Sequence, residues 1–186
     1  NATELNSTRE SHVRDAAAMC RFLAWLDAEP HGTLTEIDAA TQLEEIRRQD
    51  PLMEEISFDT ISAAGPHAAL PHYRVTTDSN RTLNAGEVYL VDSGAQYQDG
   101  TTDITRTLAI GDQSDAVKRA FTRVLKGMIA ISRLRFPHGI SGRDIDAFAR
   151  AALWSAGQDY QHGTGHGVGH VLSVHEGPQN LSRRST

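Results

Sequence analysis

Residues 90–107 read LVDSGAQYQDGTTDITRT and form two β-rich pieces around a polar turn. This pattern predicts an antiparallel hairpin in which Asp92 and Asp103 share a face. With the turn centred after Tyr97, the two aspartates lie directly opposite each other, with Cβ atoms roughly 5 Å apart. With a two-residue turn at 99–100 they share the face about 13 Å apart. The pattern alone does not choose between these registers.

The two aspartates are the first candidates for chemistry. Two ionised carboxylates that face each other repel unless they share a proton or hold a cation between them. Hard divalent cations prefer oxygen ligands of this kind. Asp92 and Asp103 are therefore candidate metal ligands, and the alternative is that they are ordinary polar residues near a turn.

Helices and short strands are expected around the hairpin. Capping boxes and helical spacing predict helices at about 7–28 and 35–49, and two more that begin near 117 and 141. The first helix is expected to bury Val13, Ala17, Cys20 and Ala24, and the second Ile37, Ala40, Leu43 and Ile46. The strands are expected at 58–63, 88–92, 101–110 and 171–174. The order α-α-β-β-β-α-α-β indicates an α+β fold of two similar halves, with the second incomplete.

Composition limits the classes to which the chain can belong. Its 186 residues include 39% hydrophobic and 23% charged residues, which suits one soluble domain with a real core. The 18 Lys and Arg against 24 Asp and Glu give a charge of −6, which argues against a nucleic-acid binder. No apolar run is long enough to cross a membrane, and the opening residues 1–4 lack the basic-then-apolar character of a signal, so no membrane partner is expected. The single cysteine, Cys20, is expected to be a buried thiol, and a cytoplasmic location follows.

Four of the nine histidines lie in loops near the hairpin or in the glycine-rich stretch that ends the chain. They are His72, His162, His166 and His175. Each by itself has a structural alternative, but four beside paired aspartates indicate a shared site. The glycines between His162 and His166 argue against a helical zinc pair, and the chain has neither HExxH nor a Walker motif. The other five are expected to be surface or structural residues: His12, His31, His67, His138 and His170.

Three stretches carry a resemblance to a known family. They are His72-Tyr73, residues 90–107, and residues 162–178 with the sequence HGTGHGVGHVLSVHEGP. Together they resemble the catalytic domain of the Xaa-Pro aminopeptidases (aminopeptidase P), within the methionine aminopeptidase, prolidase and creatinase superfamily. The resemblance covers nearly the whole chain. It implies an α+β pita-bread fold in which residues 1–186 form part of one catalytic metallopeptidase domain.

The resemblance also implies roles for individual residues. Asp92 would bind one of two divalent metal ions, usually Mn²⁺ with Zn²⁺ or Co²⁺ as alternatives. Asp103 would bridge both ions, which implies the register that brings the aspartates together, and His166 would complete part of the second site. His72, His162 and His175 would be active-site histidines that contact substrate, move protons and stabilise the oxyanion. The implied reaction removes the first residue of peptides with proline in second position, by attack of a metal-bridging hydroxide.

The chain departs from the family pattern in its ligand count. The family uses two glutamates downstream of the HEGP segment, and after His166 the only carboxylate here is Glu176. We therefore expect that the chain is truncated at its C-terminal end, holds metal weakly and is inactive alone. Because it does not begin with Met and the domains that precede this one in related aminopeptidases are missing, we expect truncation at its N-terminal end as well.

Three alternatives stay open. The chain could come from a prolidase that acts on Xaa-Pro dipeptides. It could come from a metal-independent creatinase, which the retained ligands disfavour. It could also be a non-catalytic pita-bread module that binds peptides or proteins, and such relatives usually have eroded ligands. A homodimer is expected from the resemblance alone.

Overall fold

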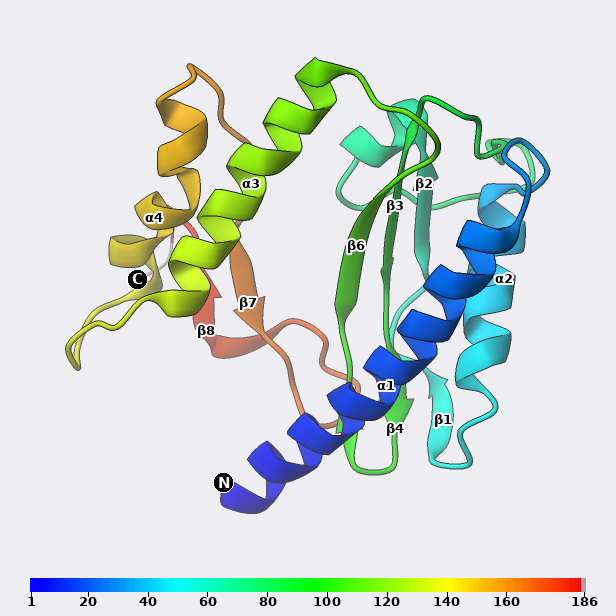
Figure 1. The fold of residues 1–186 in the computed structure, drawn as a ribbon. Helices are drawn as coiled ribbons and strands as arrows, with labels where there is room; N and C mark the ends of the chain where they lie inside the picture. The colour runs from blue at the N-terminus through cyan, green and yellow to red at the C-terminus, as the bar shows by residue number, and fades with distance from the viewer. Residues whose placement is uncertain (185–186) are drawn as a thin grey trace. The chain divides into compact units, whose positions relative to one another are not determined.

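The computed structural model describes residues 1–184, which fall into two compact units. The first unit contains residues 1–113 and 168–174, and the second contains 114–167 and the segment from 175 onward. The elements of the first unit are α1 (Ala2–Ala28), α2 (Glu36–Arg47), β1 (Met53–Ile56), β2 (Ile61–Ala64), the 3-10 helix η1 (Gly65–Ala69), β3 (Val88–Ser93), β4 (Ala95–Tyr97), β5 (Gly100–Thr101) and β6 (Ile104–Ala109). Those of the second are α3 (Asp115–Arg133), α4 (Gly142–Trp154), β7 (Gly165–Gly167) and β8 (Glu176–Leu181) (Figure 1).

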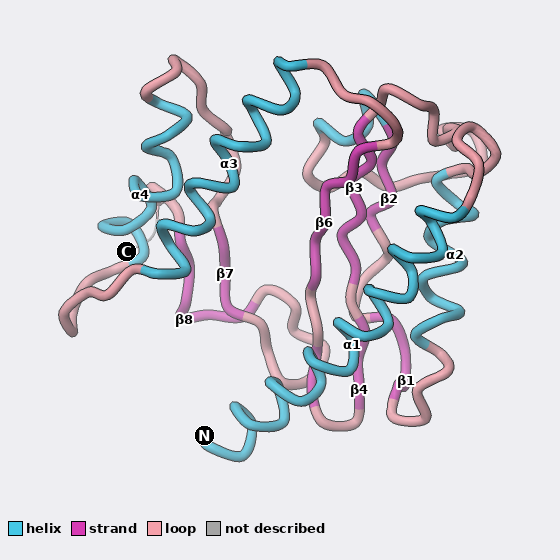
Figure 2. Tube along the Cα trace, viewed as in Figure 1, coloured by secondary structure: helices cyan, strands magenta, loops and turns pink. Residues whose placement is uncertain are grey.

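The strands of the first unit form two antiparallel sheets. One has the order β2-β3-β6 and the other the order β1-β4-β5. Figure 2 shows how the hairpin supplies strands to both, because β3 leads into β4 and β5 leads into β6. Gly94 lies at the first of these junctions, where a Cβ atom would come within 1.9 Å of the carbonyl oxygen of Thr102. Only glycine allows the two strands to approach so closely there.

Helices α1 and α2 run side by side and pack on the β2-β3-β6 sheet (Figure 1). The core between them consists of Ala18, Met19, Phe22, Ala39, Leu43, Ile46, Ala64, Leu83, Tyr89, Val91 and Ile110. Helix α1 buries Ser11, Asp15, Ala18, Met19 and Phe22, so the predicted face was wrong and Cys20 is exposed. The prediction failed because the buried face contains two polar residues, Ser11 and Asp15, whereas the neighbouring exposed face is more apolar.

The second unit is built on the helix pair α3 and α4. Helix α3 approaches α4 at Gly127, where a Cβ atom would lie 2.0 Å from the carbonyl oxygen of Ala149. Ser141 and Asp144 form the capping box predicted for α4. Strand β8 lies against α4 and pairs with β7. The strand predicted at 171–174 was wrong: these residues form bends, and the strands of this region are β7 before them and β8 after them.

Of the remaining predictions, the ends of α1 and α2 and the position of β3 are confirmed within a few residues. Helix α1 begins earlier than predicted, because Asn1 and Glu4 form its capping box. Strand β1 was missed. Within residues 1–184, no helix combines the length and hydropathy needed to cross a bilayer.

Candidate metal and peptidase site

The register of the hairpin places the two aspartates on one face. Strand β4 pairs Tyr97 with Gly100, so the turn consists of residues 98–99 and both predicted registers were wrong. Asp92 lies opposite Thr105, whose hydroxyl donates a 2.6 Å hydrogen bond to its Oδ1 atom. The same register places Asp103 two positions from Thr105, which makes it the diagonal neighbour of Asp92 on the same face. Diagonal neighbours have Cα atoms roughly 7–8 Å apart, within reach of a shared cation.

A buried network from α1 and α2 fixes the backbone next to Asp103. Thr102 is fully buried and donates a 2.5 Å hydrogen bond to Asp15, while its hydroxyl accepts one from the Ala95 amide at 2.9 Å. Tyr97 also donates to Asp15, at 3.2 Å. Arg47 pairs with Asp15 through Nε at 2.6 Å, and both side chains are at most 1% exposed. The carboxylate of Asp15 therefore holds both strands of the hairpin beneath the two candidate ligands.

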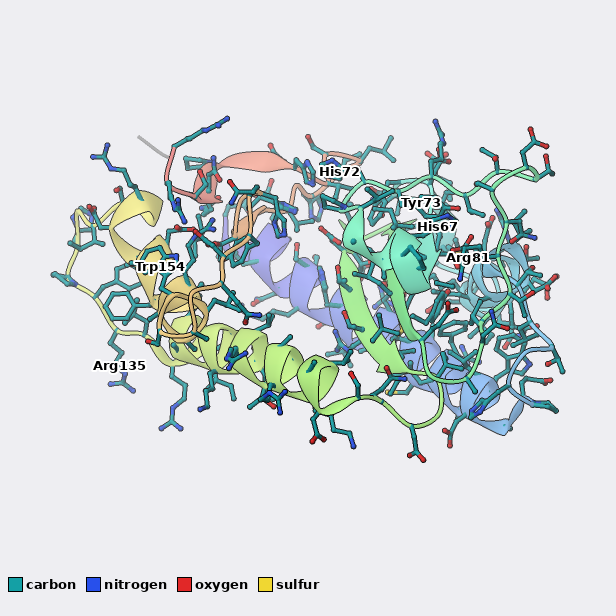
Figure 3. All side chains as sticks on the ribbon, turned by 90° about the horizontal axis from the view of Figure 1, so that it is seen from above. His67, His72, Tyr73, Arg81, Arg135 and Trp154 are labelled. Carbon is teal, nitrogen blue, oxygen red and sulfur yellow. The ribbon has the colours of Figure 1, made fainter. Side chains whose placement is uncertain are left out.

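His72 lies in an exposed turn of the first unit, as its proline-rich surroundings predicted. The next residue, Tyr73, is buried. Figure 3 shows His72 beside Tyr73, with His67 and Arg81 following in the same row. Burial, with a contribution from the nearby Glu36 carboxylate, raises the pKa of the Tyr73 hydroxyl, so that it stays protonated and donates.

The second unit brings His166 and His175 together. Their ring centroids are 4.0 Å apart in an edge-on arrangement. His166 lies in β7, and its Nδ1 atom is 2.8 Å from the carbonyl oxygen of Gly167. Donation from Nδ1 places the ring lone pair on Nε2, which is a form of imidazole that ligates metal ions. His175 follows a loop, not the predicted apolar strand.

His162 belongs to a loop that the guanidinium of Arg150 organises. Its ring stacks on Tyr160 with centroids 4.7 Å apart. Arg150 is buried in α4 and donates to the carbonyl oxygens of Tyr160 (2.6 Å) and His162 (2.9 Å). It also pairs with Asp146 at 2.7 Å. Although burial opposes ionisation, hydrogen bonds from Arg150 and Thr164 hold the pKa of Asp146 below its ordinary value.

The segment between His166 and His175 includes a loop that packs on the hairpin in the first unit. Gln96 of β4 is buried, and its Oε1 atom accepts from the amide of Leu172 at 2.7 Å. The same Oε1 atom accepts from the Thr101 hydroxyl at 2.5 Å. Leu172 has a φ of 55°, a left-handed conformation that is uncommon for a leucine. A strained residue is thus held by a side chain from the strand that follows Asp92.

The sequence profile of metallopeptidase family M24 matches residues 6–186. The chain belongs to metallopeptidase family M24. It is 52% identical to the probable Xaa-Pro aminopeptidase P of Laccaria bicolor over 99% of its own length and 29% of that relative. The chain therefore spans under a third of the length of this relative.

Solved structures of M24 enzymes have the same fold. The X-prolyl aminopeptidase of Caenorhabditis elegans, described as a cytosolic enzyme with a di-nuclear active site, superposes with a TM-score of 0.94. It is 46% identical, and the match covers 100% of this chain and 31% of that one. An Xaa-Pro dipeptidase from Bacillus anthracis gives a TM-score of 0.84 at 30% identity, over 100% of this chain and 49% of that one. The pita-bread fold expected from the motifs is confirmed.

The donors of this M24 chain fit a divalent metal ion in kind. Two carboxylates share one face of the hairpin, and His166 holds its Nδ1 atom against a carbonyl oxygen as metal-binding histidines do. The three candidate ligands are divided between the two units. Among residues 1–184, no cluster of three His, Cys, Asp or Glu side chains is arranged to hold a metal ion.

Sequence reasoning missed the buried side chains that support these segments. They are Asp15, Glu36, Gln96, Thr102 and Arg150. Asp15 carried a signal, since it shares helical spacing with Ala18, Met19 and Phe22 and a charged residue in a core stripe needs buried partners. Arg150 also carried one, since it lies four residues after Asp146 on α4. The partners of Glu36, and Asp15 as the partner of Thr102, lie too far along the chain for spacing to reveal them.

Proposed function

We propose that this chain is part of the catalytic domain of an Xaa-Pro aminopeptidase, which removes the first residue of peptides with proline in second position. The observation that carries the proposal is that three candidate metal ligands and three accessory histidines are present in a chain 52% identical to a probable Xaa-Pro aminopeptidase P. The edge contact of His166 with His175 supports it, because it joins a candidate ligand to a candidate proton donor.

The proposed metal ligands are Asp92, Asp103 and His166, with Asp103 shared between two divalent ions. Mn²⁺ is the proposed metal, and Zn²⁺ or Co²⁺ are alternatives that the same donors accept. When bound, the ions would supply Lewis-acid activation of water and of the peptide carbonyl. The hydroxyl of Thr105 orients Asp92 by its hydrogen bond to Oδ1.

The three accessory histidines would act on the substrate. An imidazole near the scissile bond can donate to the oxygen on which negative charge develops and can protonate the departing proline nitrogen. We assign the carbonyl side to His175. His72 and His162 would hold the substrate and pass protons, each from a loop that a buried charged side chain anchors.

The ligand count predicts that these 186 residues are inactive alone. Glu176 is the only carboxylate after His166, and the proposal gives it no ligand role. Two further carboxylates would have to come from elsewhere in the working polypeptide. The short span of the chain relative to its relatives is consistent with this requirement.

Location and assembly are two further parts of the proposal. We propose a cytoplasmic protein, since the lone cysteine suits a reducing compartment and the C. elegans structure is described as cytosolic. A homodimer is a further proposal, and light scattering of the purified protein tests it.

The experiment that tests the proposed function compares this chain with the longest polypeptide that its gene encodes, called here the full-length gene product. Both are incubated with Mn²⁺ and an Xaa-Pro-Xaa tripeptide or an Xaa-Pro dipeptide, and release of the first residue is measured. Tripeptide cleavage by the full-length gene product alone supports the proposal. Preference for the dipeptide indicates a prolidase, no cleavage of either indicates a binding module, and cleavage by the 186 residues alone overturns the ligand count.

A further inference from the structure

Glu36 is a fully buried carboxylate that none of the proposed chemistry uses. It is the first residue of α2 and is 0% exposed. Its Oε1 atom lies 2.6 Å from the amide nitrogen of Ala64 and 2.8 Å from Nδ1 of His67. Its Oε2 atom lies 3.0 Å from the Tyr73 hydroxyl and 3.1 Å from the amide nitrogen of Arg81. Four groups thus use the full hydrogen-bonding capacity of one ionised carboxylate.

These four groups come from both ends and from the middle of one segment. We call residues 64–81 the His72 loop. Ala64 ends β2, and Arg81 closes the loop where its carbonyl oxygen accepts from the backbone amide of Glu36 at 2.9 Å. Both ends of the loop therefore meet at a single residue, and His67 and Tyr73 attach its interior to the same side chain.

Tyr73 transmits this anchor to the neighbouring His72. Its ring stacks on that of His67 with centroids 4.2 Å apart, and its hydroxyl also reaches Ser79 Oγ at 2.9 Å. Its backbone amide donates to the carbonyl oxygen of Leu70 at 3.1 Å. With ring, hydroxyl and backbone all held, the Cα atom of the adjacent His72 has little freedom to move. Figure 3 shows Tyr73 and His67 close together, with His72 near them.

A carboxylate at this position provides more than packing. Burial of a carboxylate is expensive, and well-packed apolar residues often stabilise a protein as much or more. The carboxylate fixes the orientation of the groups around it, because two backbone amides, a phenol and an imidazole bond to it at once. Such fixed geometry matters most where a nearby group must meet a substrate in one orientation.

We propose that Glu36 is a positioning residue that holds His72 in its reactive orientation through Tyr73 and His67. This inference rests on the proposed peptidase function, since it assigns His72 a contact with substrate. Glu36 itself touches neither substrate nor metal in this proposal.

A double-mutant cycle on the full-length gene product tests the proposal. Tyr73→Phe removes the hydroxyl that reaches Glu36 and keeps the stacked ring, and His72→Ala removes the group that is positioned. We expect Tyr73→Phe to lower kcat/KM for an Xaa-Pro-Xaa peptide by roughly tenfold or more. In the His72→Ala background the same change should cost less than about twofold, because the two residues act as a unit. An equal loss in both backgrounds overturns the proposal.

Two further measurements separate positioning from folding. Tyr89→Phe removes another buried hydroxyl, which bonds Ser62 at 2.7 Å, and should leave kcat/KM within about twofold. His67→Phe keeps the stack on Tyr73 and removes the bond to Glu36, and it serves as the second variant if Tyr73→Phe fails to fold. It should give the same coupling to His72→Ala, and equal losses in both backgrounds again overturn the proposal.

Hydrogen exchange distinguishes failure of this inference from failure of the proposed function. Amides of the His72 loop should exchange at least tenfold faster in Glu36→Gln than in the wild type, because the amide side chain replaces one acceptor oxygen with a donor. Unchanged exchange overturns the inference even if the enzyme cleaves proline peptides. If the wild type cleaves nothing, the proposed function and the catalytic role of the loop fail together, while faster exchange still identifies Glu36 as its anchor.

Discussion

The hydroxyl of Thr102 donates a 2.5 Å hydrogen bond to the buried carboxylate of Asp15, although 87 residues separate the two in the chain. Thr102 directly precedes the candidate bridging ligand Asp103, and its carbonyl oxygen accepts from Ser57 Oγ at 2.9 Å. The backbone that carries Asp103 is therefore fixed from a helix beneath the sheet. Residues that orient metal ligands commonly affect metal affinity although they never touch the metal.

Thr102→Val should weaken metal binding. The valine has the same shape but cannot donate to Asp15 or accept from the Ala95 amide, so the backbone at Asp103 loses two restraints. We expect the Mn²⁺ dissociation constant of the full-length gene product, measured by titration calorimetry, to rise about tenfold or more. Thr102→Ser keeps the hydroxyl and should bind nearly as well as the wild type. Equal affinity for the valine variant would show that Asp15 does not support the site.

Arg47→Met should destabilise the fold far more than the same change at the next residue. The Arg47 side chain is 1% exposed and pairs with Asp15. The substitution removes this partner and leaves the carboxylate of Asp15 buried and unpaired. The expected loss is about 3–5 kcal/mol in the free energy of unfolding. Arg48 pairs with Glu44 on the surface. Arg48→Met should therefore lower the free energy of unfolding by about 1 kcal/mol or less. Urea unfolding followed by circular dichroism measures both, and similar losses would contradict the assignment.

Acid should weaken the anchor of the His162 loop. The pKa of Asp146 is lower in the folded protein than its ordinary value of 3.8, so its contribution to stability is fully present above about pH 5. It is lost as the pH falls through the folded pKa. Asp146→Asn should therefore lower Tm strongly at pH 7 and by a smaller amount at pH 3. Asp112→Asn, at an exposed loop position, is the control. A Tm difference that does not change with pH would show that the charge of Asp146 has no part in the anchor.

Gln96→Leu should loosen the loop between His166 and His175. The change leaves the Leu172 amide without the oxygen that it bonds at 2.7 Å, at a cost of about 1–3 kcal/mol. Amide exchange at residues 168–174 should become faster, and the strained φ of Leu172 should relax. Gln98→Leu, in the exposed turn of the same hairpin, should leave that exchange unchanged. Slow exchange in both variants would contradict the role of Gln96.

The hairpin shows what sequence pattern could and could not predict. Alternation predicted Asp92 and Asp103 on one face, because successive side chains of a strand point to opposite faces. The register of β3 with β6 is consistent with that prediction. The prediction of the register failed because the turn at 98–99 lacks the Asn-Gly or Asp-Gly sequence that usually marks a two-residue turn. An error of one residue in the turn moved the pair from opposite to diagonal.

The prediction of the buried face of α1 failed for a different physical reason. Apolar periodicity favoured the stripe through Val13, which is 71% exposed, over the stripe through Asp15. Asp15 is buried because Arg47, Tyr97 and Thr102 satisfy its carboxylate, and these partners are distant in sequence. The candidate site residues could be named from the motifs. Their supports at Asp15, Glu36 and Arg150 required the three-dimensional structure.

The central claim is that the Asp92 and Asp103 hairpin makes this chain part of a metal-dependent, proline-specific aminopeptidase. The most direct test measures Mn²⁺-dependent release of the first residue from Xaa-Pro-Xaa and Xaa-Ala-Xaa peptides by the full-length gene product and its Asp103→Asn variant. The account predicts that the wild type cleaves the proline peptide at least about tenfold faster, that chelation abolishes cleavage, and that Asp103→Asn is inactive. Cleavage that persists in Asp103→Asn would contradict it. Equal rates of cleavage for the proline and alanine peptides would contradict it as well.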